Sequence, residues 1–264
     1  MHKFVFFNQQ IIPASQTKLS AISSATFYGK GIFTSLAIYD SKPFLWEKHW
    51  SRLVENATRI GLDFDFSEET VAESLAQIIK HNKIGNGRAR LTFFDESAQG
   101  IWAIENDKRT SLLMTTGDFR PLSDELKLTV SPYLINSTSP LINVKSCNYL
   151  ENLLALEETQ KRGFDEAVRL NEKGEIVSAA MANIFWIKDD EIFTPSLQTG
   201  CLAGTTREFI LEKYEVVEVE ESIETLHKAD AVFLTSAGLG VKQFFFNKNK
   251  AKHLKFIDLL PFAT

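Results

Sequence analysis

Short runs in which apolar residues alternate with polar ones occupy most of the first half of the chain. Such runs favour β-strands, because successive side chains of a strand point to opposite faces of a sheet. The expected strands are Lys3–Phe7, Phe33–Tyr39, Arg88–Phe94, Ile101–Glu105 and Ser111–Thr116. Apolar residues spaced three and four apart predict two helices, Glu47–Ile60 and Ser67–Lys80. The first half therefore indicates an α+β layer.

Local residues mark where the expected helices begin and end, and where the first domain ends. Ser67 precedes Glu69 and a run of helix-forming residues, as expected of a capped start. Gly61 follows the first pattern and is placed to end that helix. The periodicity stops at Gly117–Ser123, where turn residues cluster. We therefore expect an N-terminal α/β domain over residues 1–118 and a C-terminal α/β domain over residues 119–264.

The second half again mixes strands and helices. The expected strands are Leu126–Ser131, Glu166–Asn171, Ile176–Ser178, Ile184–Ile187, Glu191–Thr194, Glu215–Val219, Ala231–Thr235 and Val241–Phe246. The expected helices are Asn148–Arg162, Thr206–Tyr214 and Ile223–Lys228. Neither an internal repeat nor a low-complexity segment interrupts this order.

Composition changes this picture little. The 264 residues are 44% hydrophobic and 24% charged, as in ordinary folded proteins, and the net charge of −5 is spread along the chain. Nucleic-acid binding is therefore not expected. No apolar run approaches the length of a membrane span, and the start lacks the pattern of a secretory signal. Two cysteines suit a reducing compartment, so we expect a cytoplasmic protein without a metal site.

Lys145 is the first residue that suggests chemistry. It follows the mostly apolar run Leu141–Val144 and precedes an expected helix. Apolar surroundings disfavour the charged form of an amine, and a neutral lysine is a nucleophile and proton carrier. A solvated surface lysine is nevertheless the commoner case, so this position alone decides nothing.

Three other places could hold an anion. Gly204–Arg207 leads into an expected helix, whose first amides bind anions, although it could equally be a plain helix start. Thr235–Gly238 ends an apolar strand, where an ordinary turn is the alternative. His49 and Arg52 lie three apart on the first expected helix, so the arginine could hold a phosphate with the histidine as support, or both could be surface residues.

These pieces occur together in a familiar order. The chain resembles the fold type IV pyridoxal-phosphate enzymes, the class IV aminotransferase family, which includes branched-chain aminotransferases, D-amino acid aminotransferases and aminodeoxychorismate lyases. The resemblance extends from about residue 3 to about residue 246 and is closest to the lyases. The segments that carry it are Tyr28–Thr34, His49–Leu53, Val144–Tyr149, Ala182–Trp186, Thr194–Pro195 and Gly204–Arg207. In the first, the aromatic residue and the threonine are adjacent, whereas the family separates them by one residue.

The resemblance implies a two-domain enzyme of the D-amino acid aminotransferase-like fold, with pyridoxal 5'-phosphate in the cleft between the domains and usually a homodimer. Lys145, in the second domain, would carry the cofactor as a Schiff base and move protons, and Thr34 would be a second proton or orientation partner. The implied cofactor-binding residues are Arg52, Lys145, Ser178, Asn183, Thr205, Thr206, Thr235 and Ser236. The partner would be a small-molecule amine substrate.

One departure from the family bears on the reaction. Ser178 stands where the family has a glutamate that keeps the pyridine nitrogen protonated. Serine does not enforce protonation, so the cofactor would be a weaker electron sink. Glu175 should point to the opposite face and is not expected to substitute. An elimination that ends in an aromatic ring needs less help than transamination. We therefore favour conversion of 4-amino-4-deoxychorismate to 4-aminobenzoate and pyruvate.

Two alternatives stay open. One is an aminotransferase for D-amino or branched-chain amino acids, and the other is a cofactor-binding homologue without turnover. The arginine with which several relatives hold a substrate carboxylate appears here as Phe93 or Phe94. Arg88 and Arg90 lie on the same expected strand and on one face of it, but the sequence does not show which way that face points.

Overall fold

A computed structural model describes residues 1–97, 109–119 and 126–244. The described chain divides into two compact units, which are treated separately below. The first unit comprises the described residues up to Phe119 together with Val144–Asn148, and the second comprises residues 126–143 and 149–244. The expected strand Ile101–Glu105 lies outside the described residues. No helix in the described ranges has both the length and the apolar character needed to cross a bilayer.

The first unit is built on an antiparallel sheet of six strands in the order β2-β1-β6-β5-β3-β4. The strands are β1 (Phe4–Phe7), β2 (Gln10–Pro13), β3 (Gly31–Tyr39), β4 (Lys42–Pro43), β5 (Gly87–Asp95) and β6 (Thr110–Gly117). The short strands β2 and β4 and the helix α1 (Ser24–Tyr28) were not expected from the sequence. Both short strands complete tight hairpins whose turns carry positive φ angles, at Asn8 and Gln9 and at Asp40 and Ser41.

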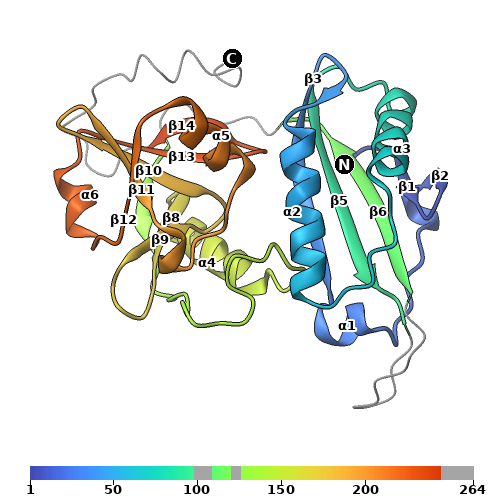
Figure 1. Cartoon of the computed structure of the whole chain (residues 1–264), viewed down its shortest axis with the longest axis horizontal. Helices are drawn as coiled ribbons and strands as arrows, with labels where there is room; N and C mark the ends of the chain where they lie inside the picture. Colours follow the sequence, from blue (N-terminus) through green and yellow to red (C-terminus); the bar gives the residue numbers. More distant parts are fainter. Residues whose placement is uncertain (98–108, 120–125, 245–264) are drawn as a thin grey trace. The chain divides into compact units, whose positions relative to one another are not determined.

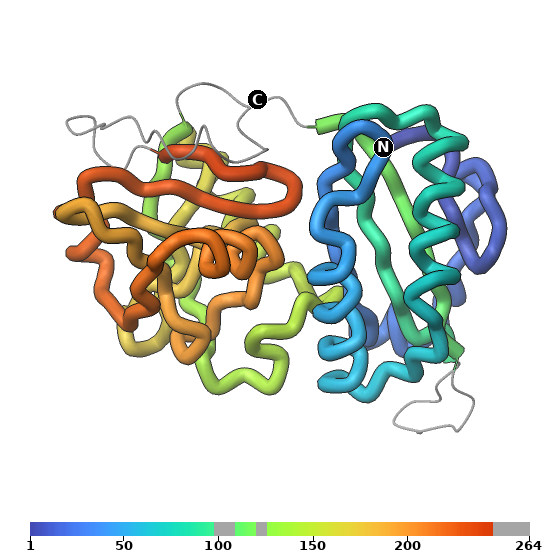
Figure 2. Tube along the Cα trace, turned by 45° about the horizontal axis from the view of Figure 1, so that its top comes forward, coloured from blue at the N-terminus to red at the C-terminus, as the bar shows by residue number. Residues whose placement is uncertain are grey.

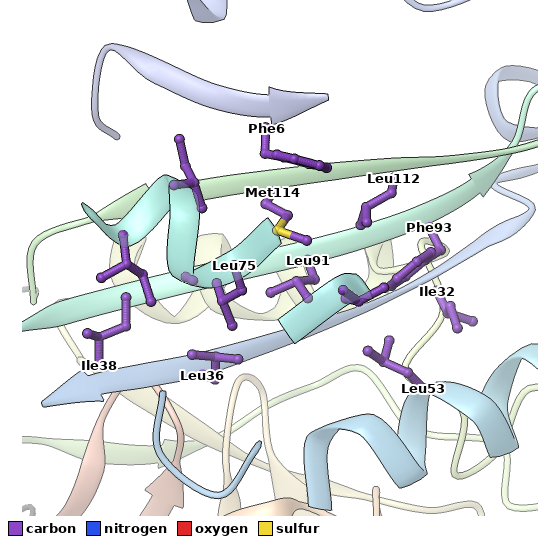
Figure 3. Packing of buried hydrophobic residues seen from close by; sticks show 14 of the residues in the cluster. Phe6, Ile32, Leu36, Ile38, Leu53, Leu75, Leu91, Phe93, Leu112 and Met114 are labelled. Carbon is purple, nitrogen blue, oxygen red and sulfur yellow. The ribbon is translucent and has the colours of Figure 1, made fainter. Parts of the chain in front are cut away.

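Two long helices, α2 (Trp46–Arg59) and α3 (Glu68–His81), lie side by side across one face of this sheet, as both Figure 1 and Figure 2 show. Apolar side chains of β3, β5 and β6 meet those of the helices in the core of the unit (Figure 3). Leu36, Leu75 and Leu91 are fully buried there. Burial of this size, at roughly 2 kcal/mol for each large aliphatic side chain, is what fixes the helices to the sheet.

The helix ends agree with the sequence signals. The Ser67 side chain accepts a hydrogen bond from the backbone N–H of Thr70, which caps the start of α3. Gly61 follows α2 with a φ of 60°, a conformation that glycine adopts without strain. The predicted capped start and the predicted helix end are both confirmed.

The segment that contains Lys145 pairs with β3. The backbone N–H of Phe33 donates to the carbonyl of Lys145 (2.9 Å), and the N–H of Cys147 donates to the carbonyl of Gly31 (2.8 Å). These bonds give Val144–Asn148 to the first unit, whereas we expected the lysine in the second domain. We had placed Lys145 in the second domain because it follows the boundary near residue 118 in the sequence. A segment can, however, add to the edge of a sheet formed by residues far from it in the sequence. That the two units are domains stays a prediction.

The second unit contains two sheets. One is a five-stranded sheet in the order β12-β11-β10-β13-β14, formed by β10 (Asn183–Lys188), β11 (Glu191–Pro195), β12 (Val216–Val219), β13 (Ala231–Ser236) and β14 (Gly240–Phe244). The other has three strands, β7 (Leu128–Val130), β8 (Glu166–Leu170) and β9 (Ile176–Ala179). Apolar residues of both sheets, Val168 of β8 and Leu234 of β13 among them, share one core. The mixed α and β architecture that we expected is confirmed.

The helices of this unit are α4 (Leu150–Lys161), α5 (Thr205–Lys213) and the short α6 (Glu224–Lys228). Each lies within two residues of the expected bounds. Its strands also match the expected ones closely, except that the last expected strand, Val241–Phe246, runs past the described residues.

Candidate functional site

Thr34 is placed by the alternation of β3. Ile32, Thr34 and Leu36 point to the face that α2 covers, and Ile32 and Leu36 belong to the apolar core. Thr34 is therefore a fully buried polar residue directly beneath the helix. Its hydroxyl needs hydrogen-bond partners, because an unpaired buried hydroxyl costs about 1–3 kcal/mol.

Those partners come from α2. The Thr34 Oγ1 lies 2.6 Å from the His49 Nδ1 and accepts a hydrogen bond of 2.8 Å from the Arg52 Nη2. His49 and Arg52 are three residues apart and thus on one side of the helix, as expected from the sequence. Because two side chains of α2 occupy the hydroxyl, the geometry favours an orienting role for Thr34 over a role in proton transfer. Its catalytic role remains a prediction.

His49 is neutral in this setting. Burial holds the pKa of the His49 imidazole well below its usual range, and the positive charges of Arg52 and Lys145 lower it further. A neutral imidazole next to the Thr34 hydroxyl supports Arg52 without repelling it. His49 and Arg52 thus share the Thr34 hydroxyl, and the supporting role of His49 stays a prediction.

Lys145 lies beside an aromatic ring and a second cation. Its Nζ is 4.5 Å from the centre of the Phe33 ring, and the Arg90 guanidinium carbon is 3.6 Å from the same centre. Both distances fit cation–π contacts. Phe33 is buried, whereas the Arg90 side chain is exposed. We call Thr34, His49, Arg52, Phe33, Arg90 and Lys145 the lysine cluster.

The electrostatics of this cluster suit a lysine nucleophile. Burial lowers the pKa of the Lys145 amine well below its usual range, and the charges of Arg52 and Arg90 lower it further. An amine with a depressed pKa is neutral in a larger fraction of molecules and can attack a carbonyl or accept a proton. The sequence anticipated this from the apolar run before Lys145, but the two arginines add to it.

The structure also resolves the orientation of the arginines on β5. Ala89, Leu91 and Phe93 point into the core beneath the helices, so Arg88 and Arg90 point to the opposite face. Phe93 is fully buried against Phe64 and Phe66. Phe93 therefore has no place in a substrate site, and Arg90 is the arginine of this strand that lies near Lys145.

In the second unit, Asn183 and Thr235 form a second cluster with the start of α5. They are directly opposite each other in the β10–β13 pair, so their side chains share one face. The Asn183 Nδ2 donates to the carbonyl of Leu202 (2.8 Å). A Cβ on Gly204 would lie 2.0 Å from the Asn183 Oδ1, so only glycine fits this position. Asn183 thereby fixes the loop that enters the helix.

The start of α5 presents backbone amides and hydroxyls. Gly204 is the N-cap, and no side chain in the described part of the protein caps the helix. The first-turn amides of Thr206 and Arg207 have no acceptor within the helix, as at every helix start. Arg207 itself turns away: it donates to the carbonyl of Pro195 (3.0 Å) and pairs with Glu218. These contacts of the Arg207 side chain thus hold the start of the helix in place.

Thr235 supplies the observation that tests whether an anion fits. Its Oγ1 is buried and has no hydrogen-bond partner among the described residues. Ser236 Oγ accepts from the backbone N–H of Leu239 (3.1 Å) and keeps its own proton for donation. A phosphate group at this helix start would accept hydrogen bonds from such hydroxyls and amides. The residues present therefore fit the phosphate of a pyridoxal cofactor.

Ser178 lies on β9 of the three-stranded sheet, half-buried, without a side-chain hydrogen bond in the described ranges. Carboxylates nearby in sequence are engaged elsewhere. Glu175 accepts from the Asn171 Nδ2 (2.7 Å), and the buried Glu166 accepts from the backbone N–H groups of Ala180 and Met181. That Glu175 does not substitute at position 178 stays a prediction, and its bond to Asn171 supports it.

Sequence reasoning thus named most of both clusters, but it could not orient Arg90 and it missed Arg169. The direction of Arg90 depends on which face of the sheet the helices cover. Arg169 was not singled out at all, although a charged residue in the otherwise apolar run Ala167–Leu170 was a usable signal. The roles of all site residues in binding and catalysis remain predictions.

Comparison with known proteins gives three kinds of match. The family model described as amino-transferase class IV matches residues 31–244. The aminodeoxychorismate lyase of Bacillus subtilis is 30% identical over 250 residues, which cover 91% of this chain and 85% of the relative. A putative branched-chain-amino-acid aminotransferase of Methanocaldococcus jannaschii is 25% identical and covers 91% and 86%. Among solved structures, the branched-chain aminotransferase of Thermoproteus uzoniensis has a TM-score of 0.89 at 21% identity, covering 97% and 91%.

Proposed function

We propose, from the premise that this chain belongs to the class IV aminotransferase family, that it is a lyase that converts 4-amino-4-deoxychorismate to 4-aminobenzoate and pyruvate. Members of this family are pyridoxal-phosphate-dependent enzymes, and pyridoxal 5'-phosphate is the cofactor. The bound cofactor supplies a carbonyl carbon that condenses with amines and an aromatic ring that withdraws electrons.

The proposed ligands of the cofactor follow from the two clusters. Lys145 would bond covalently to it, and Ser178 would be the residue that contacts the pyridine nitrogen. The proposed hydrogen-bond donors to its phosphate are Arg52, Thr205, Thr206, Thr235 and Ser236. Asn183 contributes by holding the Gly204 loop in place.

In the reaction, this chain's own residues hold the substrate and move one proton. Once the substrate amine has displaced it from the cofactor, Lys145 Nζ would be a free amine and would accept the proton from substrate C4, which its depressed pKa permits. The C–O bond to the enolpyruvyl group then breaks and the ring becomes aromatic. The released enolpyruvate takes up a proton and becomes pyruvate, so the proton balance closes. Arg90, exposed beside Lys145, binds a substrate carboxylate.

The observation that carries the choice of a lyase is the absence of a carboxylate beside Ser178 among the described residues. Glu166 and Glu175 are occupied, and the residue directly across from Ser178 on β8 is Arg169. Without a carboxylate, the pyridine nitrogen of the bound cofactor would not be held protonated, and the cofactor would be a weaker electron sink. Forming an aromatic product compensates for this in the elimination but not in transamination.

The second candidate is an aminotransferase for branched-chain or D-amino acids. The putative branched-chain aminotransferase is 25% identical to this chain and covers as much of it as the lyase does. This similarity supports the aminotransferase as a second candidate. The two candidates share the cofactor and Lys145, and they differ in what Ser178 can support.

The test combines trapping with product analysis. Borohydride reduction of the holoenzyme followed by peptide mapping should place the cofactor on Lys145, and Lys145→Ala should lose both the label and turnover. Lys80→Ala, at an exposed lysine of α3, is the matched control and should keep both. Equal amounts of 4-aminobenzoate and pyruvate support the lyase. Amino-group transfer between amino and keto acids without 4-aminobenzoate would replace it by the second candidate, and neither product would overturn both.

We also propose that the enzyme is a homodimer. Leu150, Leu153 and Leu154 of α4 are exposed and share one side of the helix. An apolar stripe of this kind is typical of a covered surface. Light scattering after size-exclusion chromatography should give twice the chain mass, and a monomer at micromolar concentration would contradict the proposal.

A further inference from the structure

Arg169 is a buried cation that the proposed reaction does not use. Its side chain is 1% exposed. The Arg169 Nε donates a hydrogen bond to the carbonyl of Tyr133 (3.3 Å), and the Nη2 donates one to the carbonyl of Leu134 (3.0 Å). Burying a guanidinium costs several kcal/mol unless charges and hydrogen bonds compensate. A residue of this kind in a small apolar strand needs an explanation.

No buried carboxylate in the described ranges neutralises Arg169. Among the residues that the structure describes, the one carboxylate within 4 Å is that of Glu151, whose oxygen lies 3.8 Å from the Nη2 and whose side chain is 80% exposed. Water screens such an exposed charge strongly. Burial accordingly lowers the pKa of Arg169, with Glu151 and Tyr149 at the start of α4 opposing the shift. The positive charge of Arg169 is therefore only weakly neutralised, and it acts on other groups on the same face of the sheet.

Ser178 lies on that face. Arg169 of β8 and Ser178 of β9 are directly opposite each other in the antiparallel pair. Side chains of such a pair stand on the same face, with Cβ atoms about 5 Å apart. The neighbouring pair, Val168 and Ala179, points to the other face and belongs to the apolar core. Arg169 and Ser178 thus form a polar pair on the face directed away from the core.

Both members of this pair can donate hydrogen bonds. A guanidinium has donors and no acceptor, and a hydroxyl can donate to an atom with a lone pair. The Arg169 Nη1 makes no hydrogen bond within the described part of the chain, and neither does the Ser178 hydroxyl. A cation beside a donor favours a neutral or negative acceptor atom and disfavours a protonated one.

We propose that Arg169 and Ser178 together keep the cofactor's pyridine nitrogen unprotonated, Ser178 by donating a hydrogen bond to it and Arg169 by its positive charge. This rests on the proposed function, which places Ser178 at that nitrogen. The serine alone permits either protonation state, whereas the pair selects one. The weak electron sink is then a built-in property of the site that favours elimination over transamination.

The test reads the nitrogen directly. The protein is loaded with pyridoxal phosphate labelled with ¹⁵N in the ring, and the ¹⁵N chemical shift is followed with pH. The wild type should show an unprotonated nitrogen over the whole range in which it is folded. Arg169→Leu should raise the pKa of the nitrogen by about one to three units, the usual effect of removing a nearby like charge. Arg169→Lys keeps the charge and should resemble the wild type.

Arg162→Leu is the matched control. Arg162 also lies in the second unit and donates to the carbonyl of Val130, but it is partly exposed and pairs with Glu158. Its removal should leave the nitrogen unchanged. A wild-type nitrogen that is protonated at neutral pH would overturn the inference, as would an Arg169→Leu titration equal to that of Arg162→Leu.

The wild-type titration decides the matter even if Arg169→Leu does not fold. Failure of the proposed function looks different from failure of this inference. A protein that binds no cofactor, judged by the fluorescence of added pyridoxal phosphate, overturns both. Bound cofactor with a protonated nitrogen overturns the inference alone and leaves the lyase to be judged by its products.

Discussion

Replacing Thr34 by valine tests the buried contact that orients Arg52. Valine has nearly the shape of threonine, so the substitution removes the hydroxyl without opening a cavity. The hydroxyl accepts from the charged Arg52 Nη2 at 2.8 Å and lies 2.6 Å from the His49 Nδ1. A hydrogen bond to a charged group contributes about 1.5–3 kcal/mol and a neutral one about 1 kcal/mol. The free energy of unfolding should therefore fall by about 2.5–4 kcal/mol.

The assay is urea denaturation of the protein without cofactor, with the midpoint compared at unchanged slope. Thr159→Val is the control, because Thr159 is equally buried but its hydroxyl makes one bond, to the carbonyl of Ala155 (2.7 Å). That variant should lose about 1 kcal/mol. Thr34→Ser keeps the hydroxyl, removes one methyl group and should also lose about 1 kcal/mol.

A second measurement connects this contact to the proposed function. If Arg52 binds the cofactor phosphate, its loss of orientation in Thr34→Val should weaken cofactor binding about tenfold or more, while Thr34→Ser and Thr159→Val bind nearly as the wild type. Equal destabilisation by Thr34→Val and Thr159→Val would refute the reasoning about the charged bond. An unchanged dissociation constant in Thr34→Val would remove Arg52 from the proposed phosphate ligands.

Two shorter predictions concern charge. Arg90→Met removes the guanidinium over Phe33 and with it the proposed carboxylate contact, so KM should rise about ten- to hundredfold with little change in kcat. Equal KM values for Arg90→Met and the control Arg88→Met, on the same face of β5, would contradict this. His49 has a folded-state pKa below its unfolded value of about 6.5, so unfolding takes up a proton. The free energy of unfolding of the protein without cofactor should be highest above pH 6.5 and should decline as the pH falls towards the folded-state pKa of His49. Urea denaturation at several pH values should show a smaller decline in His49→Asn.

Much of this fold was predictable because its elements carry local signals. The alternation along β3 and β5 and the three-and-four spacing in α2 and α3 follow from which face is buried. Ser67 and Gly61 mark helix ends through hydrogen bonding and φ that depend on few neighbours. The family model, which matches residues 31–244, confirms the recognition made from the motifs.

What the sequence did not reveal depends on pairing between distant segments. Lys145 joins the first unit because its segment adds to the edge of β3, and no local pattern specifies that partner. Arg90 could not be oriented before the covered face of the sheet was known. Arg169 gains its meaning only from the β8–β9 register, which places it opposite Ser178.

That register also changes what a glutamate at position 178 would do. By the serine argument alone, Ser178→Glu should restore a protonated pyridine nitrogen and raise any transaminase side reaction. In the structure the new carboxylate would stand opposite Arg169, and a buried guanidinium is a strong competitor for it. The glutamate should then pair with Arg169 and leave the nitrogen largely unprotonated. The double variant Ser178→Glu/Arg169→Leu removes the competitor, so transaminase activity should rise in the double variant well beyond the product of the two single effects. Rates that simply multiply would mean that the two positions act independently.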